Sequence, residues 1–174
     1  PAFNSGPADP NKAGDLKAAV VREITAALNF RNQGDYVRAI AGLTEALRLD
    51  PTCAEAYAHR GAALRLMGDY ARAIADCSAA VANDRNLVAA YETRGGVYRT
   101  TGDNAKAVAD FSEVIRLDPK NTLAFSQRGN ALSEMGEAGL AIEDYTAAIK
   151  LDPRSLWSWQ SRGLAYANTG AHML

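Results

Sequence analysis

A sequence pattern with a period of 34 residues recurs along the chain. A glycine followed by an acidic residue opens each copy, and the copies read GDYVRAIAGLTEALRLDP from Gly34, GDYARAIADCSAAVANDR from Gly68, GDNAKAVADFSEVIRLDP from Gly102 and GEAGLAIEDYTAAIKLDP from Gly136. Gly170 keeps the same interval. A fixed period of this length is typical of repeat architectures, in which each repeat buries its apolar face only against its neighbours. The sequence therefore predicts a stack of similar repeats.

Each repeat is predicted to contain two helices joined by a tight turn. Apolar residues after each glycine, such as Ala39, Leu43 and Ala46, are spaced to lie on one face of a helix. The segment ahead of each glycine also repeats at helical spacing, as in Tyr57 and Gly61. The glycine permits the left-handed conformation that closes the first helix, and the acidic residue after it caps the second. Asp-Pro then ends the second helix in most repeats, because proline cannot continue it.

The period and its aromatic, glycine, alanine and proline positions resemble the tetratricopeptide repeat family, from about Val20 to Gly170. The resemblance implies an all-α fold, a right-handed superhelical solenoid of stacked antiparallel helix pairs whose first helices line a concave groove. We expect a flexible leader over residues 1–14 and one domain over 15–174, with a long first helix from about Asp15. Four repeats are expected at about 20–53, 54–87, 88–121 and 122–155, followed by a partial repeat or capping helix over 156–174.

One junction and one end of the stack depart from the pattern. The second repeat has Asn83 where others have leucine and Arg85 where others have proline, so we expect the stack to be loosest from Asn83 to Leu87. After the fourth repeat, a first helix with Trp159 and Gly163 in register is not followed by a second helix in the sequence. The open face of this helix is a candidate surface for self-association.

Arginine and aspartate recur together, 16 residues apart, in three repeats. The arginines lie on the first helix and the aspartates on the second, and the pairs are Arg60 with Asp76, Arg94 with Asp110, and Arg128 with Asp144. The first repeat has neither residue, since Ala26 and Gly42 occupy the positions. We expect structural ion pairs between the two helices of one repeat, largely shielded from water, rather than ligand-binding groups.

The groove is expected to be lined by first-helix residues that the core positions do not use, and the candidates are Glu55, His59, Glu92, Thr93, Gln127, Asn130 and Trp157. Near the helix ends lies a column of arginines, Arg31, Arg65 and Arg99. Their forked donors suit carboxylates or the carbonyls of an extended peptide. Alternatively, each pairs with the aspartate four residues later and stabilises the helix end. The set of Lys, Asn and Arg with which co-chaperone members hold a carboxylate is not present at the matching positions.

Composition and motifs disfavour other function classes. A net charge of −1 and a pI near 6.2 give no overall attraction to nucleic acid, and no apolar run approaches the length of about 18 residues needed for a membrane span. The sequence contains no HExxH, GxSxG or phosphate-binding loop. Its two cysteines and two histidines lack metal-site spacing. We therefore expect no enzyme activity, no metal and no cofactor. The sequence leaves two cellular locations open, the cytoplasm and a compartment reached with a leader peptide that is later removed.

The sequence thus predicts a non-catalytic scaffold that binds a peptide or helix of a partner protein in the groove. One alternative is a structural module that assembles into homo-oligomers through the incomplete C-terminal repeat. Another is the interaction domain of a larger protein. Fold-level resemblance cannot name the partner.

Overall fold

The computed structural model describes residues 10–168, with side chains from Gly14 onward, and all regular secondary structure in this range is helical. The chain divides into two compact parts, one up to Arg85 and one from Asn86. The N-terminal part contains α1 (Pro10–Asn32), α2 (Tyr36–Leu49), α3 (Ala54–Leu66) and α4 (Tyr70–Asn83). The C-terminal part contains α5 (Val88–Thr100), α6 (Asn104–Leu117), α7 (Thr122–Glu134), α8 (Ala138–Leu151) and α9 (Leu156–Asn168).

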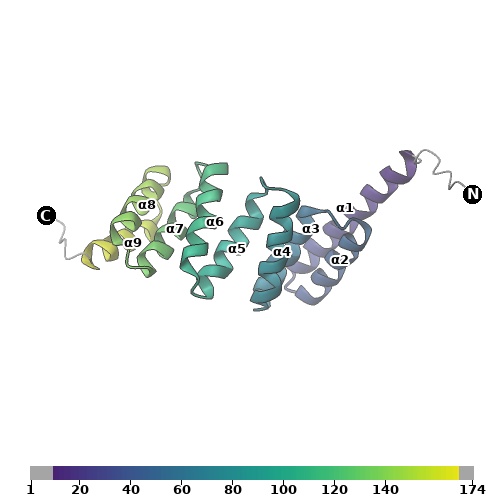
Figure 1. The fold of residues 1–174 in the computed structure, drawn as a ribbon, viewed down its shortest axis with the longest axis horizontal. Helices are drawn as coiled ribbons and strands as arrows, with labels where there is room; N and C mark the ends of the chain where they lie inside the picture. Colours follow the sequence, from purple (N-terminus) through teal and green to yellow (C-terminus); the bar gives the residue numbers. More distant parts are fainter. Residues whose placement is uncertain (1–9, 169–174) are drawn as a thin grey trace, which may run out of the picture. The chain divides into compact units, whose positions relative to one another are not determined.

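Within each part, consecutive helices pack side by side (Figure 1). The odd-numbered helices are the first helices of the repeats, and they also touch one another, α1 with α3, α5 with α7 and α7 with α9. Each second helix packs against the first helix of its own repeat, and α2, α6 and α8 also contact the first helix of the next repeat. The boundary between the two parts lies within the Asn83–Leu87 stretch that departs from the repeat pattern. Each part therefore presents its own surface of first helices.

Helix α1 begins at Pro10, earlier than the expected start near Asp15. Proline is well suited to the first turn of a helix, because its fixed φ matches the helix and its missing N–H has no partner there in any case. The expected leader over residues 1–14 therefore overlaps the helix at residues 10–14. Its remainder, residues 1–9, lies outside the described residues.

The turns between paired helices have one geometry, set by the repeated glycine. Gly34 has φ of 80°, and Gly68, Gly102 and Gly136 lie within a few degrees of it. The N–H of Gly34 donates to the carbonyl of Arg31 at 3.0 Å, and the N–H of Asp35 donates to that of Phe30 at 2.9 Å. These two bonds satisfy carbonyls at the end of the helix in the manner of a Schellman motif. The Asp35 side chain then accepts from the N–H of Arg38 and caps α2.

Small residues let the helices approach closely. The alanines at four equivalent positions on the second helices, Ala39, Ala73, Ala107 and Ala141, are fully buried. One such approach is at Gly129 of α7, where an added Cβ would lie 2.8 Å from Cε1 of Tyr145 on α8. A real Cβ does not approach an aromatic carbon so closely, so the bulk of Tyr145 requires a glycine opposite it.

Candidate functional site

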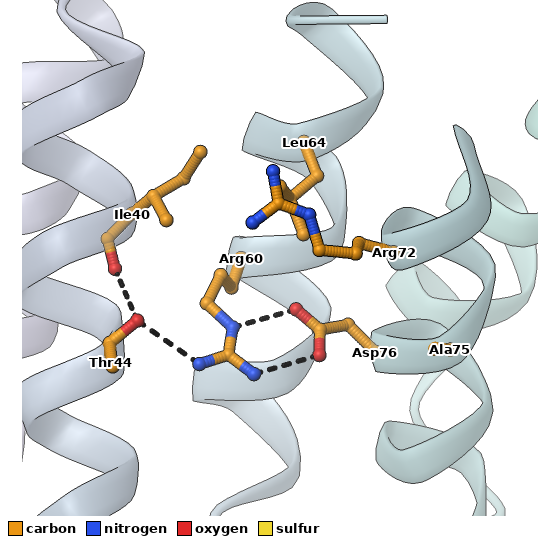
Figure 2. A pocket seen from close by; sticks show the side chains of 7 residues that line it. All are labelled: Ile40, Thr44, Arg60, Leu64, Arg72, Ala75 and Asp76. Atoms are coloured by element: carbon orange, nitrogen blue, oxygen red, sulfur yellow. Dashed lines mark hydrogen bonds and ion pairs between the residues drawn. The ribbon is translucent and has the colours of Figure 1, made fainter. Parts of the chain in front are cut away.

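The arginines and aspartates spaced 16 residues apart lie opposite each other on paired helices. Arg60 of α3 donates from Nε and Nη2 to the two carboxylate oxygens of Asp76 on α4, at 2.7 and 2.8 Å (Figure 2). Its Nη1 donates to Oγ1 of Thr44 on α2 at 3.1 Å, and that hydroxyl donates to the carbonyl of Ile40. The arginine side chain is 21% exposed and the aspartate side chain 10%. The hydrogen bonds that Asp76 accepts raise the pKa of Arg60. The guanidinium thus links α2, α3 and α4.

The C-terminal part repeats this arrangement. Arg128 of α7 donates to both oxygens of Asp144 on α8, at 2.7 and 2.8 Å, and its Nη1 donates to Oγ of Ser112 on α6 at 3.0 Å. Arg94 of α5 donates to both oxygens of Asp110 on α6, at 2.9 and 2.7 Å. In each repeat the guanidinium also lies over an aromatic ring, such as Phe125 beneath Arg128 at 5.8 Å. These arginines are held by contacts within the fold.

The first helices of the C-terminal part enclose an open pocket of about 370 Å³. Side chains from four helices line it: Arg99 from α5; Gln127, Asn130, Ser133 and Glu134 from α7; Tyr145 from α8; and Trp157, Ser161 and Leu164 from α9. Four of the candidate groove residues meet here, namely Arg99, Gln127, Asn130 and Trp157. The sequence reasoning did not single out Glu134 or Tyr145. Tyr145 reaches the pocket from a second helix because Gly129 leaves room for its ring.

Polar groups form one wall of this pocket. The hydroxyl of Tyr145 donates to Oδ1 of Asn130 at 2.9 Å, and burial, with the nearby carboxylate of Glu134, raises the pKa of Tyr145. The hydroxyl therefore stays protonated at neutral pH. Nη1 of Arg99 lies 3.3 Å from Oε1 of Glu134. Within the described residues, Oε1 of Gln127 and Nε of Arg99 have no hydrogen-bond partner. The arginine's charge is matched by a carboxylate, while polar atoms of the wall remain without protein partners.

Apolar groups form the other wall. The side chain of Trp157 is 60% exposed and that of Leu164 is 68% exposed. Both lie on α9 and face the same pocket as the side-chain amides. Large apolar side chains bordered by polar groups are typical of binding surfaces for proteins and peptides. This pocket therefore combines an apolar anchor with adjacent hydrogen-bonding groups.

The N-terminal part has different surface chemistry. Nη1 of Arg31 on α1 lies 3.5 Å from Nδ1 of His59 on α3. Burial, followed by the charge of Arg31, lowers the pKa of His59, and Glu55 opposes this shift only partly. His59 is therefore neutral at physiological pH and accepts from the guanidinium. A second pocket, of about 410 Å³, lies between α1 and the end of α2 and is mainly apolar, with lining residues Leu16, Lys17, Val20, Val21, Ile24, Leu49, Asp50, Cys53 and Glu55.

Three further candidates lie apart from both pockets. Arg65 is exposed near the end of α3. Glu92 of α5 accepts a hydrogen bond at 2.8 Å from Nδ2 of Asn121, whose Oδ1 caps α7 through the N–H of Ala124. Thr93 is half-buried on α5. Glu92 therefore helps to hold the start of the next first helix, a contact that the sequence analysis did not foresee.

The alternative in which each arginine of the column pairs with the aspartate four residues later is wrong. Asp35 instead pairs with Arg38, at 3.3 Å, and Asp69 and Asp103 bind the side chains of Arg72 and Lys106. Hydrogen bonds from these partners lower the pKa of Asp69 and of Asp103. The aspartate starts the second helix, so its neighbours are the residues of that helix. The arginines of the first helix are left to contact other groups, as Arg31 and Arg99 do.

The described residues also bear on metal binding and on membrane insertion. No group of three or more His, Cys, Asp or Glu side chains between residues 14 and 168 is arranged to hold a metal ion. None of the helices α1 to α9, as far as they are described, is long and apolar enough to cross a membrane.

Comparison with known proteins agrees with the geometry of the helix pairs. Models of the tetratricopeptide repeat match residues 24–88, 67–122 and 124–155. No curated protein sequence matches the chain. Among solved structures, the fold is similar to that of a MamA protein, with a TM-score of 0.82 at 25% sequence identity, over 88% of this chain and 84% of that chain.

Two further structures show the same fold at lower identity. YrrB, described as a TPR protein with an unusual peptide-binding site, has a TM-score of 0.79 at 21% identity, over 93% of this chain and 84% of its own. The first TPR of Spaghetti (RPAP3), bound to the HSP90 peptide SRMEEVD, has a TM-score of 0.67 at 24% identity, over 68% of this chain and 97% of its own. The matched repeats cover more than half of the sequence. The chain belongs to the tetratricopeptide repeat family and is an all-α helical-repeat solenoid.

Proposed function

We propose that the chain is a non-catalytic scaffold that binds an extended peptide segment or a helix of a partner protein, with the pocket between α5, α7 and α9 as its principal contact. Family membership supports an interaction role, and two proteins of the same fold are described with peptide-binding sites. The observation that carries the proposal is the meeting of exposed Trp157 and Leu164 with the side-chain amides of Gln127 and Asn130 in one open pocket.

The chemistry of the pocket favours a particular kind of segment. Arg99 is already matched by Glu134, so the pocket has little net charge with which to attract an acidic ligand. The amides of Gln127 and Asn130 offer donors and acceptors that complement a peptide main chain. Trp157 supplies a large, flat contact for an apolar side chain. We therefore infer that the preferred segment carries a large apolar residue, and that acidic residues contribute less than the arginine column suggests.

Tryptophan fluorescence provides a direct test, because the chain contains only two tryptophans, Trp157 and Trp159. A display library of random peptides is panned against the chain, and the enriched peptides are titrated into the Trp159→Phe variant. Phe125 occupies the equivalent position of the preceding repeat, so this substitution follows the repeat pattern. Trp157 is then the only tryptophan. Binding in the pocket should shift its emission to shorter wavelength as water is displaced from the indole.

Two variants identify the contact. Trp157→Leu introduces the residue found at the equivalent position of the preceding repeat, Leu123. It should weaken binding of the enriched peptides about tenfold or more, as expected for loss of an aromatic anchor. Arg65→Ala, on an exposed arginine of the other part, is the matched control and should leave the affinity unchanged. Enriched peptides that bind without any change in Trp157 emission, or with equal affinity for Trp157→Leu, would contradict the assignment.

Self-assembly is the second candidate, and it rests on α9. Four large apolar side chains of this one helix are exposed, Leu156, Trp157, Trp159 and Leu164. Sedimentation over a dilution series separates the two candidates. A monomer at all concentrations removes the second, whereas a concentration-dependent dimer that Leu164→Ser abolishes would support it over the first.

A further inference from the structure

Helix α9 carries the contact residues of a first helix in full, yet no second helix covers it within residues 10–168. Its Arg162 lies over the ring of Trp159 at 4.6 Å, as Arg60 lies over Tyr57 at 5.7 Å. Nη1 of Arg162 donates to Oγ1 of Thr146 on α8 at 3.2 Å, as Nη1 of Arg60 donates to Thr44. The guanidinium is thus oriented by the same two contacts as in the complete repeats.

The contact missing from this set is the carboxylate. In the complete repeats, Nε and Nη2 of the arginine donate to both oxygens of an aspartate on the second helix. Among the described residues, no carboxylate is bonded to Arg162. Its Nε and Nη2 therefore form a fixed fork of donors, and a carboxylate is the group that such a fork binds best.

The surface beside this fork is shaped for a large side chain. Gly61, Gly95 and Gly129 are buried because a side chain of the second helix lies against each of them, Cys77, Phe111 and Tyr145 respectively, whereas Gly163 is exposed. A Cβ added at Gly163 would meet nothing within 4 Å. Trp159 is 47% exposed, while the equivalent Tyr91 is buried. The glycine and the tryptophan thus leave open the space that a second helix fills in the other repeats.

We propose that this face of α9, defined by Trp159, Arg162 and Gly163, is a binding site for one amphipathic helix of a partner polypeptide. The apolar face of that helix carries an aspartate followed directly by a large residue, with an alanine three positions before the aspartate. The second helices α6 and α8 have this pattern in Ala107-Asp110-Phe111 and Ala141-Asp144-Tyr145. The aspartate binds the fork of Arg162, and the large residue fills the space over Gly163.

A second folded copy of this chain does not supply such a helix. The aspartate and aromatic residue of α6 are buried, and so are those of α8. In α4 the equivalent Asp76 and Cys77 are buried as well, and α2 has Gly42 in place of the aspartate. Among the described helices α1 to α9, each one that carries the pattern already uses it within its own repeat. None of the helices α1 to α9 is therefore available as the occupant, and the site is distinct from the pocket between α5, α7 and α9.

The probe is a capped synthetic peptide with the sequence of residues 103–118, DNAKAVADFSEVIRLD, which contains the Asp110-Phe111 pair and no tryptophan. It is titrated into the full chain carrying Trp157→Leu, so that Trp159 is the only tryptophan. We expect a saturable shift of Trp159 emission to shorter wavelength. A peptide with asparagine in place of that aspartate should bind roughly tenfold more weakly or worse, because the fork of Arg162 then lacks its charged acceptor.

Two variants of the chain complete the test. Arg162→Gln should weaken the original peptide by about the same factor and remove the difference between the aspartate and asparagine peptides. Gly163→Leu should abolish binding by filling the space, and circular dichroism checks that both variants keep their helical content. No saturable shift, or equal affinity for the two peptides, would overturn the proposal. So would sedimentation showing a dimer of the unmodified chain that Arg162→Gln dissociates, since the occupant would then be a second copy.

Discussion

The ion pair of Arg60 and Asp76 allows a quantitative prediction about stability. Arg60→Ala removes both hydrogen bonds from a carboxylate whose side chain is only 10% exposed, and it leaves that charge between α3 and α4. Breaking a buried pair in this way typically costs about 3 to 5 kcal/mol. Arg60 itself is 21% exposed, and water can enter the space that it leaves, so we expect a loss of about 3 kcal/mol, near the lower end of that range.

Native-state hydrogen exchange measures this loss where it arises. Repeat proteins unfold locally as well as globally, so the opening free energy of individual helices is better defined than a single melting temperature. A loss of about 3 kcal/mol makes the slowest amides of α3 and α4 exchange roughly 100-fold faster. Replacing both Arg60 and Asp76 by leucine should recover most of the loss, because no buried charge is then left without a partner.

Arg72→Ala is the matched control. Arg72 lines the same pocket as Arg60 and Asp76 (Figure 2), but its side chain is 69% exposed and its partner is Asp69 in the adjacent turn. Exposed pairs of this kind contribute little to stability, because solvent screens them. If Arg60→Ala accelerates exchange in α3 and α4 no more than Arg72→Ala does, the pair is effectively solvated and the reasoning fails.

Three further predictions concern packing, capping and pH. In urea unfolding, Gly129→Ala should lower the free energy of unfolding by about 1 to 3 kcal/mol, because the added Cβ meets the ring of Tyr145. Gly163→Ala should be neutral or should stabilise α9 by up to about 1 kcal/mol. Equal effects of the two substitutions would contradict this account of helix packing. Asn121→Ala should cost about 1 kcal/mol through loss of the α7 cap, and an unchanged unfolding midpoint would count against it. His59 has a lowered pKa in the folded chain, so its protonation favours the unfolded chain. Its contribution to the free energy of unfolding is therefore complete above its unfolded pKa of about 6.5 and is lost as the pH falls below that value. Thermal unfolding between about pH 7 and pH 5.5 should therefore depend less on pH in His59→Gln than in the unmodified chain, and identical profiles would refute this.

The helix pairs could be predicted because they follow from spacings along the chain. The 34-residue period fixed the turns at the glycines, and the interval of 16 residues from Arg60 to Asp76 is the interval that brings two paired helices face to face. The four-residue spacing of Arg31 and Asp35, in contrast, did not predict a contact. Residues four apart are neighbours only within one helix, and the turn at Gly34, with φ of 80°, places Asp35 at the start of the next helix beside Arg38.

The residues that line the pocket between α5, α7 and α9 were only partly predictable, because one of them comes from a second helix. Gln127, Asn130 and Trp157 lie on the exposed side of first helices, so helical periodicity places them on one surface. The hydroxyl of Tyr145 reaches the same surface from the second helix, and this depends on the ring passing the bare backbone of Gly129. No spacing within one helix indicates such a contact, because it arises from the packing of two helices.

Chemical-shift mapping is the most direct test of the claim that a partner peptide binds between α5, α7 and α9. The isotope-labelled chain is titrated with the tightest peptide obtained by panning. We predict that the largest amide shifts cluster at Gln127, Asn130 and Ser161, with side-chain shifts at Trp157. Shifts confined to the second helices α6 and α8, or spread evenly over both parts of the chain, would contradict the claim.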